Sequence, residues 1–145
     1  MKKFVYSMQN ILNLQYKIED QQKAAFRAAS AKLEEEESLL KNMMYRKAEY
    51  ENRLKRLVSG TIDLKEVRSQ KKEIDVMKSR IRTQMMAVHL AEKNVEAARI
   101  KLTEAMIDRK TQEKMKEKAF EEYKQEAAAE ESKEIDQLVS YLHSK

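Results

Sequence analysis

Few of the side chains that do chemistry in enzymes occur in this chain at spacings that would let them act together. Glu34–Glu37 is a run of four carboxylates, and His89 and His143 are the two histidines. Adjacent positions on a helix point in different directions, so the glutamates indicate a solvated face and not a paired acid and base. Neither histidine has a second ligand four residues away, as a helical metal site would require. We therefore expect no catalytic residue, no bound metal and no cofactor.

The segment RKTQEKMKEK, residues 109–118, is the best candidate for nucleic-acid binding, because five of its ten residues are Lys or Arg. Glu113 and Glu117 interrupt it, and it lacks the Asn- and Arg-rich pattern of a leucine-zipper basic region. Interspersed Lys and Glu are typical of a solvated helix face with pairing one turn apart. We expect no nucleic-acid partner.

The composition indicates a chain of very few, long helices. Among 145 residues there are one glycine, no proline and no cysteine, and 38% of the residues are charged. Tight turns need Gly or Pro, so few turns are possible. No apolar run approaches the roughly 20 residues that span a bilayer, so any membrane association is expected to be peripheral. The last segment, residues 119–145, is acidic, with three Lys against seven Asp and Glu.

The second half of the chain repeats every seven residues, which predicts a coiled coil. One set of positions is apolar: Val67, Ile74, Ile81, Val88, Val95 and Leu102. The companion set is mixed: Gln70, Met77, Gln84, Ala91, Ala98 and Ala105.

The first half shows a looser version of this repeat in two frames. Leu33, Leu40, Tyr50, Leu54 and Leu57 fit one frame, with Met43 between them, and Ile11, Leu14 and Ile18 fit another. A shift between frames is a stutter, which locally unwinds a supercoil, and it would fall near residues 21–26.

Gly60 lies between the two patterns and predicts the turn of a helical hairpin. We expect a helix over about 4–58, a turn at 59–61 with Gly60 in the left-handed conformation, and a helix over about 62–143. Thr61 or Asp63 can cap the second helix, and Asp63 with Glu66 has the spacing of a capping box. Two helices joined by so short a loop must be antiparallel, and pairing residues whose numbers add to about 121 sets apolar against apolar. The prediction is an all-α, antiparallel coiled-coil hairpin in one domain, residues 1–145, and a monomeric rod.

The two arms of this hairpin are unequal, so the C-terminal helix should overhang, with residues beyond about 117 unpaired. Apolar side chains in this overhang would then be available for other contacts: Phe120, Tyr123, Ile135, Leu138, Tyr141 and Leu142.

Two segments resemble the flagellar export protein FliJ family. The N-terminal segment KKFVYSMQNILNLQYKIED, residues 2–20, looks like the start of that family, although Tyr16 stands where the family often carries a basic residue. The segment EAMIDRKTQEKMKEKAFEEYKQE, residues 104–126, is similar to its C-terminal block, and EIDQL near the end also fits. The length and the expected turn near residue 60 agree with the family as well.

The resemblance implies a non-enzymatic, cytoplasmic component of the flagellar type III export apparatus, peripheral at the cytoplasmic face of the cell membrane, and so a role in flagellum biogenesis, motility and chemotaxis. Its implied partners are the export ATPase ring, the membrane export gate and export chaperones. By this resemblance the ATPase-contact candidates are Phe4, Tyr6, Met8, Arg109, Lys110, Met115 and Tyr123. The export-gate candidates are Met43, Tyr50, Ile74, Met77 and Ile81. The alternative function is a general coiled-coil adaptor, or a stalk protein of a virulence type III secretion system.

Overall fold

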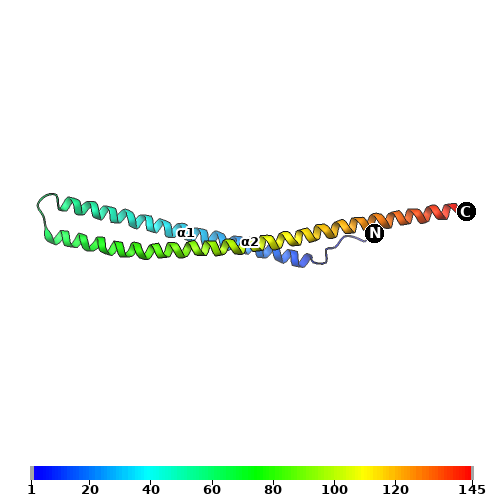
Figure 1. Ribbon diagram of the computed structural model, residues 1–145, viewed down its shortest axis with the longest axis horizontal. Coiled ribbons are helices and arrows are strands. Elements are labelled where there is room, and N and C mark those ends of the chain that lie inside the picture. Colours follow the sequence, from blue (N-terminus) through cyan, green and yellow to red (C-terminus); the bar gives the residue numbers. More distant parts are fainter. Residues whose placement is uncertain (1, 145) are drawn as a thin grey trace. The chain divides into compact units, whose positions relative to one another are not determined.

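The computed structural model describes residues 2–144, and its regular structure consists of two α-helices (Figure 1). Helix α1 spans Gln9–Leu57 and helix α2 spans Leu64–His143. The described part of the chain contains no strand, and the two helices pack against each other as a hairpin. The predicted all-α antiparallel hairpin is therefore confirmed.

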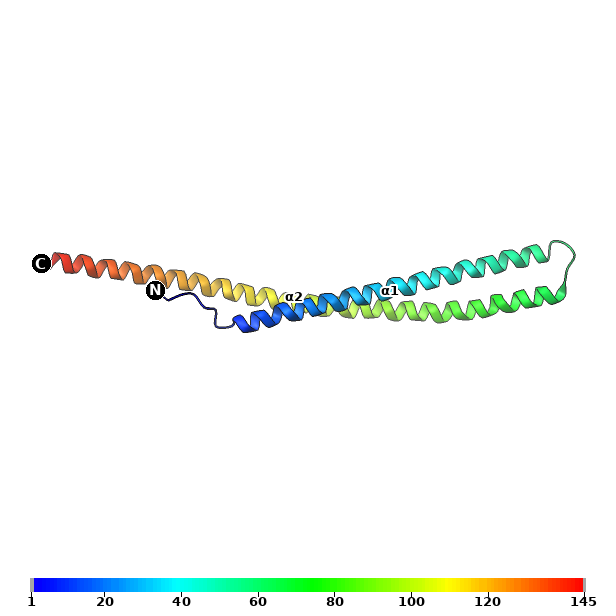
Figure 2. The ribbon, with the colours of Figure 1, turned by 180° about the vertical axis from the view of Figure 1, so that it is seen from behind.

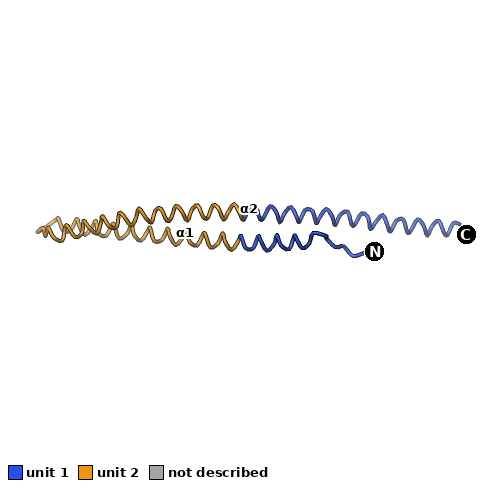
Figure 3. Tube along the Cα trace, turned by 90° about the horizontal axis from the view of Figure 1, so that it is seen from below, with its two compact units in different colours: residues 1–22, 102–145 blue, residues 23–101 orange. Residues whose placement is uncertain are grey.

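The chain divides into two compact units (Figure 3). Unit 2 is residues 23–101, and it contains the turn with the adjoining arms of both helices. Unit 1 joins residues 1–22 to residues 102–145, so it contains the N-terminal segment, the start of α1 and the second half of α2.

In unit 2, the face that α2 turns toward α1 follows the predicted seven-residue repeat. Ile74, Met77, Val88 and Ala91 are buried, as are the polar Gln70 and Gln84. Gln84 donates its Nε2 hydrogens to the backbone oxygen of Glu36, at 2.9 Å, and to Glu36 Oε2, at 2.6 Å. A buried amide needs such partners, so this bond fixes the register of the two arms close to the predicted pairing.

Along α1 the inward positions keep one seven-residue frame from end to end. They are the buried or half-buried Leu12, Glu19, Phe26, Leu33, Leu40, Lys47 and Leu54, with Met8, Gln15, Gln22, Ala29, Glu36, Met43, Tyr50 and Leu57 between them. The stutter predicted near residues 21–26 is wrong. Of the three residues that suggested it, Ile11 and Leu14 are exposed and Ile18 is half-buried, and Gln15, Glu19 and Gln22 take the inward positions of that stretch.

The connection between the helices is longer than predicted, since α1 ends at Leu57 and α2 begins at Leu64. Asp63 caps α2 as predicted, because its Oδ1 accepts the backbone N–H of Lys65 at 3.0 Å. The left-handed conformation predicted for Gly60 is wrong, since none of the described residues has a positive φ. With several residues to reverse direction, the backbone has no need of that conformation at one position.

In unit 1, α1 starts at Gln9, five residues later than predicted, and residues 2–6 run as non-helical chain beside α2 (Figure 2). Phe4 and Tyr6 face α2, whereas Val5 between them is 79% exposed. This alternation is the period of extended chain and not of a helix. The partnered part of α2 therefore extends past residue 117, to Tyr123, so the predicted overhang of α2 begins later than expected.

Candidate functional site

The N-terminal segment is held on α2 by an aromatic cluster, defined as Phe4, Phe120 and Tyr123. The Phe4 ring lies 5.1 Å from the Phe120 ring in an edge arrangement and 5.4 Å from the Tyr123 ring. Phe120 and Tyr123 are 6.2 Å apart and nearly parallel. Lys124 Nζ lies 5.0 Å from the centre of the Phe120 ring, within cation–π range. Three mutually contacting rings anchor a segment that has no helical hydrogen bonds of its own.

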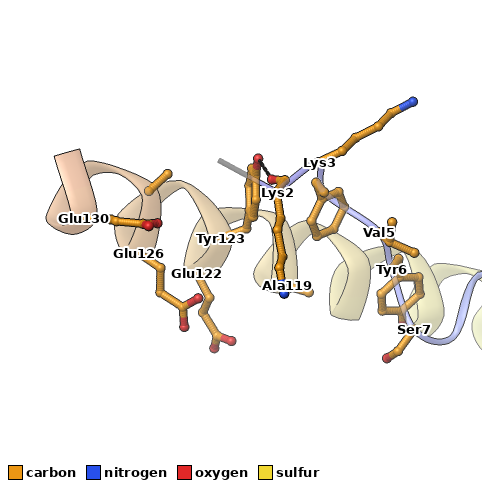
Figure 4. A pocket seen from close by; sticks show the side chains of 12 residues that line it. Lys2, Lys3, Val5, Tyr6, Ser7, Ala119, Glu122, Tyr123, Glu126 and Glu130 are labelled. Carbon is orange, nitrogen blue, oxygen red and sulfur yellow. Dashed lines mark hydrogen bonds between the residues drawn. The ribbon is translucent and has the colours of Figure 1, made fainter.

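Two tyrosine hydroxyls fix the segment further. The Tyr123 hydroxyl donates to the backbone oxygen of Lys2 at 2.6 Å, the bond drawn in Figure 4. The Tyr6 hydroxyl donates to Gln112 Oε1 at 2.9 Å, and Tyr6 is buried. The first bond satisfies an exposed backbone group and the second a part-buried amide, so both ends of the segment are tied to α2.

Next to Gln112 along α2, an ion-pair network crosses the two helices. Arg109 donates from Nε to Glu19 Oε2 at 2.7 Å and from Nη2 to Glu19 Oε1 at 3.1 Å. Its Nη1 donates to Glu113 Oε2 at 3.2 Å, and the Tyr16 hydroxyl donates to Glu113 Oε1 at 2.9 Å. Glu19 is buried, so a bidentate arginine is the partner that it requires.

The network changes proton affinities in the expected directions. The bond to Glu19, the largest cause, raises the pKa of Arg109, with Glu113 adding to the effect. The hydrogen bond that Tyr16 donates to Glu113 raises the pKa of the Tyr16 hydroxyl, because losing the proton would place two negative charges together. Both shifts keep the donated protons on Arg109 and Tyr16 at neutral pH.

These cross-helix bonds join residues about one heptad away from the predicted pairing. The residue numbers add to 128 for Glu19 and Arg109 and to 129 for Tyr16 and Glu113, whereas the predicted pairs add to about 121. Side chains on a helix lean toward its N-terminus and cover the preceding turn. In an antiparallel pair, residues whose numbers add to more than 121 therefore lean toward each other. Two long side chains can then meet although their Cα atoms lie at levels about one heptad apart. The backbone register and these contacts are thus compatible.

Two hollows adjoin the aromatic cluster. The first, of about 990 Å³, lies between residues 2–7 and α2, where Ala119, Tyr123 and three glutamates line it: Glu122, Glu126 and Glu130 (Figure 4). The second, of about 400 Å³, is walled by Phe4, Leu12, Tyr16 and Phe120, with charged side chains of α2 at its edge. Both are open surface grooves with no set of groups arranged for catalysis. Among residues 2–144, no three His, Asp or Glu side chains are placed to share a metal ion.

Four of the seven ATPase-contact candidates, Phe4, Tyr6, Arg109 and Tyr123, take part in these contacts. Met8 is half-buried at the start of α1, and Lys110 and Met115 are exposed on α2. The sequence prediction missed Glu19, Gln112 and Phe120 as members of this site. The seven-residue spacing that joins Glu19 to Leu12, Phe26 and Leu33 was the signal that could have placed Glu19 inside.

The export-gate candidates all lie in unit 2, on or beside its seam. Ile74 and Met77 are buried, with 6% and 3% of their surface exposed. Met43, Tyr50 and Ile81 are half-buried. Tyr50 and Met77 also border a hollow of about 360 Å³ with Val76 and several charged residues of α2. A more apolar hollow on α2 lies away from these candidates, where the exposed side chains of Met85, Met86 and Leu90 line it.

Neither helix in the described part of the chain is long and apolar enough to cross a membrane. No curated protein and no solved structure matches the chain in the comparisons made. A family model described as "Flagellar FliJ protein" matches residues 4–145. The chain therefore belongs to the FliJ family, whose members are components of flagellar protein export and biogenesis.

Proposed function

We propose that this chain is a non-catalytic stalk that couples the flagellar export ATPase ring to the membrane export gate. Family membership is the observation that carries the proposal, since it covers all but the first three residues. The fold of unit 1 supports it: the N-terminal segment packs on α2, held by the aromatic cluster, and the Glu19–Arg109 pair joins α1 to α2 beside it. Such an end can enter a ring while unit 2 offers a second contact surface.

In this proposal the ring contacts fall on the exposed side chains of unit 1. Lys110 and Met115 face solvent, so they are free to touch a partner without disturbing the fold. Phe4, Tyr6, Arg109 and Tyr123 shape that end through contacts within unit 1: Phe4 packs on Tyr123, Tyr6 bonds to Gln112, and Arg109 bonds to Glu19 and Glu113. We assign the gate contact to unit 2, around Tyr50, Met43 and Ile81, with Ile74 and Met77 supporting them from the seam. Export chaperones are further partners, and the protein acts at the cytoplasmic face of the membrane.

The test measures ATP turnover by the purified export ATPase under conditions where it forms its ring. Added wild-type protein should raise turnover and co-elute with the ATPase. Met115→Ser and Lys110→Glu should each weaken the stimulation several-fold, whereas the exposed Met85→Ser in unit 2 should leave it unchanged. An ATPase that is active alone but neither stimulated nor bound by this protein would refute the proposal.

The gate contact is tested separately with the cytoplasmic domain of the gate protein. Tyr50→Ser should weaken its binding, and Tyr45→Ser, at a position 63% exposed on the same helix, serves as the matched control. Equal binding by both variants would remove the assignment of the gate contact to Tyr50.

A further inference from the structure

The end of α2 carries an apolar stripe that no described residue of unit 1 covers. From residue 128 to residue 144 every side chain is exposed, yet the helix continues to His143. Ile135, Leu138, Val139 and Leu142 are 55%, 59%, 46% and 62% exposed. Their spacing of i, i+3, i+4 and i+7 places them on one face of the helix, as in a helix that packs against another. We call these four residues the tail stripe.

The tail stripe does not continue the seam between α1 and α2. The inward positions of α2 recur every seven residues through Lys116 and Tyr123, and the same spacing next reaches Glu130, Gln137 and Ser144. All three are polar and exposed. The apolar face of the tail is therefore turned away from the side on which the N-terminal segment lies. Phe4 contacts α2 at Phe120 and Tyr123, on the seam side, so the segment of residues 2–6 does not cover the stripe.

The charges around the stripe indicate what would cover it. At the helical period, Glu134 and Asp136 fall on opposite flanks of the stripe, and Glu131 stands one turn before Ile135 on the same face. Lys133 falls on the far side of the helix. An apolar ridge with carboxylates on both flanks is complementary to an apolar partner with Lys or Arg on its flanks. A second copy of the tail would set carboxylates against carboxylates, and an anionic bilayer would repel them.

We propose that the tail stripe docks on a basic amphipathic helix of another protein, with Ile135, Leu138 and Leu142 buried in the contact and Glu131, Glu134 and Asp136 paired with its Lys or Arg side chains. This contact is independent of the proposed stalk function, because it uses none of the residues assigned to the ring or the gate. In this proposal the last turns of α2 are a docking site for a partner protein.

The experiment uses the full-length protein and two designed peptides of about three heptads each, with the same leucine stripe. One peptide carries Lys on the flanks of its stripe and the other carries Glu. Binding is measured by fluorescence anisotropy at about 0.15 M salt, where long-range attraction between exposed charges is screened. The Lys peptide should bind wild-type protein at least about tenfold more tightly than the Glu peptide, because only it offers partners to the tail carboxylates.

Variants then separate the apolar from the charged contribution. Leu138→Ser and Leu142→Ser should each weaken binding of the Lys peptide about tenfold, since each removes a buried leucine from the contact. Glu134→Gln with Asp136→Asn should weaken it several-fold and flatten its salt dependence. Gln137→Ser, on the same turns but off the stripe, is the matched control and should bind like wild type. Circular dichroism should show unchanged helix content in all of them, because these side chains are exposed.

Three results would overturn the proposal. Equal binding of the two peptides would show that the carboxylates beside the stripe do not select a basic partner. Equal binding by Leu138→Ser and wild type would show that the tail stripe is not the contact surface. Sedimentation showing a wild-type dimer that Leu138→Ser dissociates would make a second copy the occupant. Loss of ATPase stimulation has no bearing on these readouts, so failure here and failure of the stalk function remain distinguishable.

Discussion

Arg109 donates two hydrogen bonds to Glu19 across the helix pair, at 2.7 and 3.1 Å, and only 4% of the Glu19 surface is exposed. The pair occupies inward positions where a coiled coil ordinarily has apolar residues. It is the polar core of unit 1, and its energetics differ from those of an ion pair on the surface. Removing one partner of a buried pair leaves an uncompensated charge, whereas replacing both with apolar residues can be neutral.

We predict that Glu19→Ala lowers the melting temperature by roughly 5–10 °C, because it leaves the Arg109 guanidinium with only Glu113. The double variant Glu19→Leu with Arg109→Leu should recover most of the loss. Glu96→Ala is the control, since Glu96 and Arg99 are both more than half exposed and their pair adds little. Thermal denaturation followed by circular dichroism checks all three. If Glu19→Ala has the same melting temperature as the Glu96→Ala control, the Glu19–Arg109 pair does not stabilise the fold.

Phe4→Ala should release the N-terminal segment without unfolding the helices. Each aromatic pair contributes about 0.5–1.5 kcal/mol beyond its buried area, and Phe4 makes two such pairs. Hydrogen exchange of the Gln9, Ile11 and Leu12 amides, which donate to the backbone oxygens of Tyr6 and Met8, should therefore speed up by about tenfold or more. Val5→Ala is the neighbouring control, at a side chain 79% exposed. If both variants exchange like wild type, the aromatic cluster does not hold the segment.

Gly60→Ala should be neutral or stabilising by about 0.4–1 kcal/mol, because alanine restricts the unfolded chain and the native position accepts it. The φ of Gly60 is not positive, and a Cβ placed there meets no atom within 4 Å. The left-handed conformation predicted from the sequence would instead make the β-branched valine of Gly60→Val strain the turn. Chemical denaturation of Gly60→Ala and Gly60→Val measures the effect. A clear loss of stability in Gly60→Ala would show that this residue needs a conformation open only to glycine.

Acid should weaken unit 2 through Glu36. The salt bridge from Lys32, at 2.9 Å, is the first cause that lowers the pKa of Glu36 below its ordinary 4.5, and the bond from Gln84 is the second. A carboxyl with a depressed pKa in the folded state contributes stability above its unfolded pKa of about 4.5 and loses it as the pH falls through the lower folded value. Between pH 6 and pH 3, the melting temperature of wild type should therefore fall more than that of Glu36→Gln.

The matched control for this prediction is Glu34→Gln, two residues away at an exposed position. It should keep the acid sensitivity of wild type. If the melting temperatures of Glu36→Gln and Glu34→Gln depend on pH in the same way, the contacts of Glu36 with Lys32 and Gln84 are not the cause of the loss of stability in acid.

The sequence by itself determined the helices, the place of the bend and the family. Val67, Ile74 and Val88 recur at a spacing that only a helix can bring to one face, and no other segment could turn as easily as the one around Gly60. The same repeat predicted which side of α2 is buried in unit 2. Phe4, Tyr6, Arg109 and Tyr123 all lie in unit 1, where Phe4 packs on Tyr123, Tyr6 bonds to Gln112 and Arg109 bonds to Glu19 and Glu113. Their contact with the ATPase stays a prediction.

Only the tertiary structure decided which polar residues lie inside. Glu19 reads as a surface residue in the sequence, and it becomes a core residue because Arg109, 90 positions away in the chain, supplies its charge and hydrogen bonds. Phe4 likewise leaves the helix that its neighbours predict, because the rings of Phe120 and Tyr123 offer extended chain a better contact than one more helical turn. Local spacing specifies a helix and its inward face. It does not specify the partner, and a buried charge or an unwound segment is stable only through the partner that it meets.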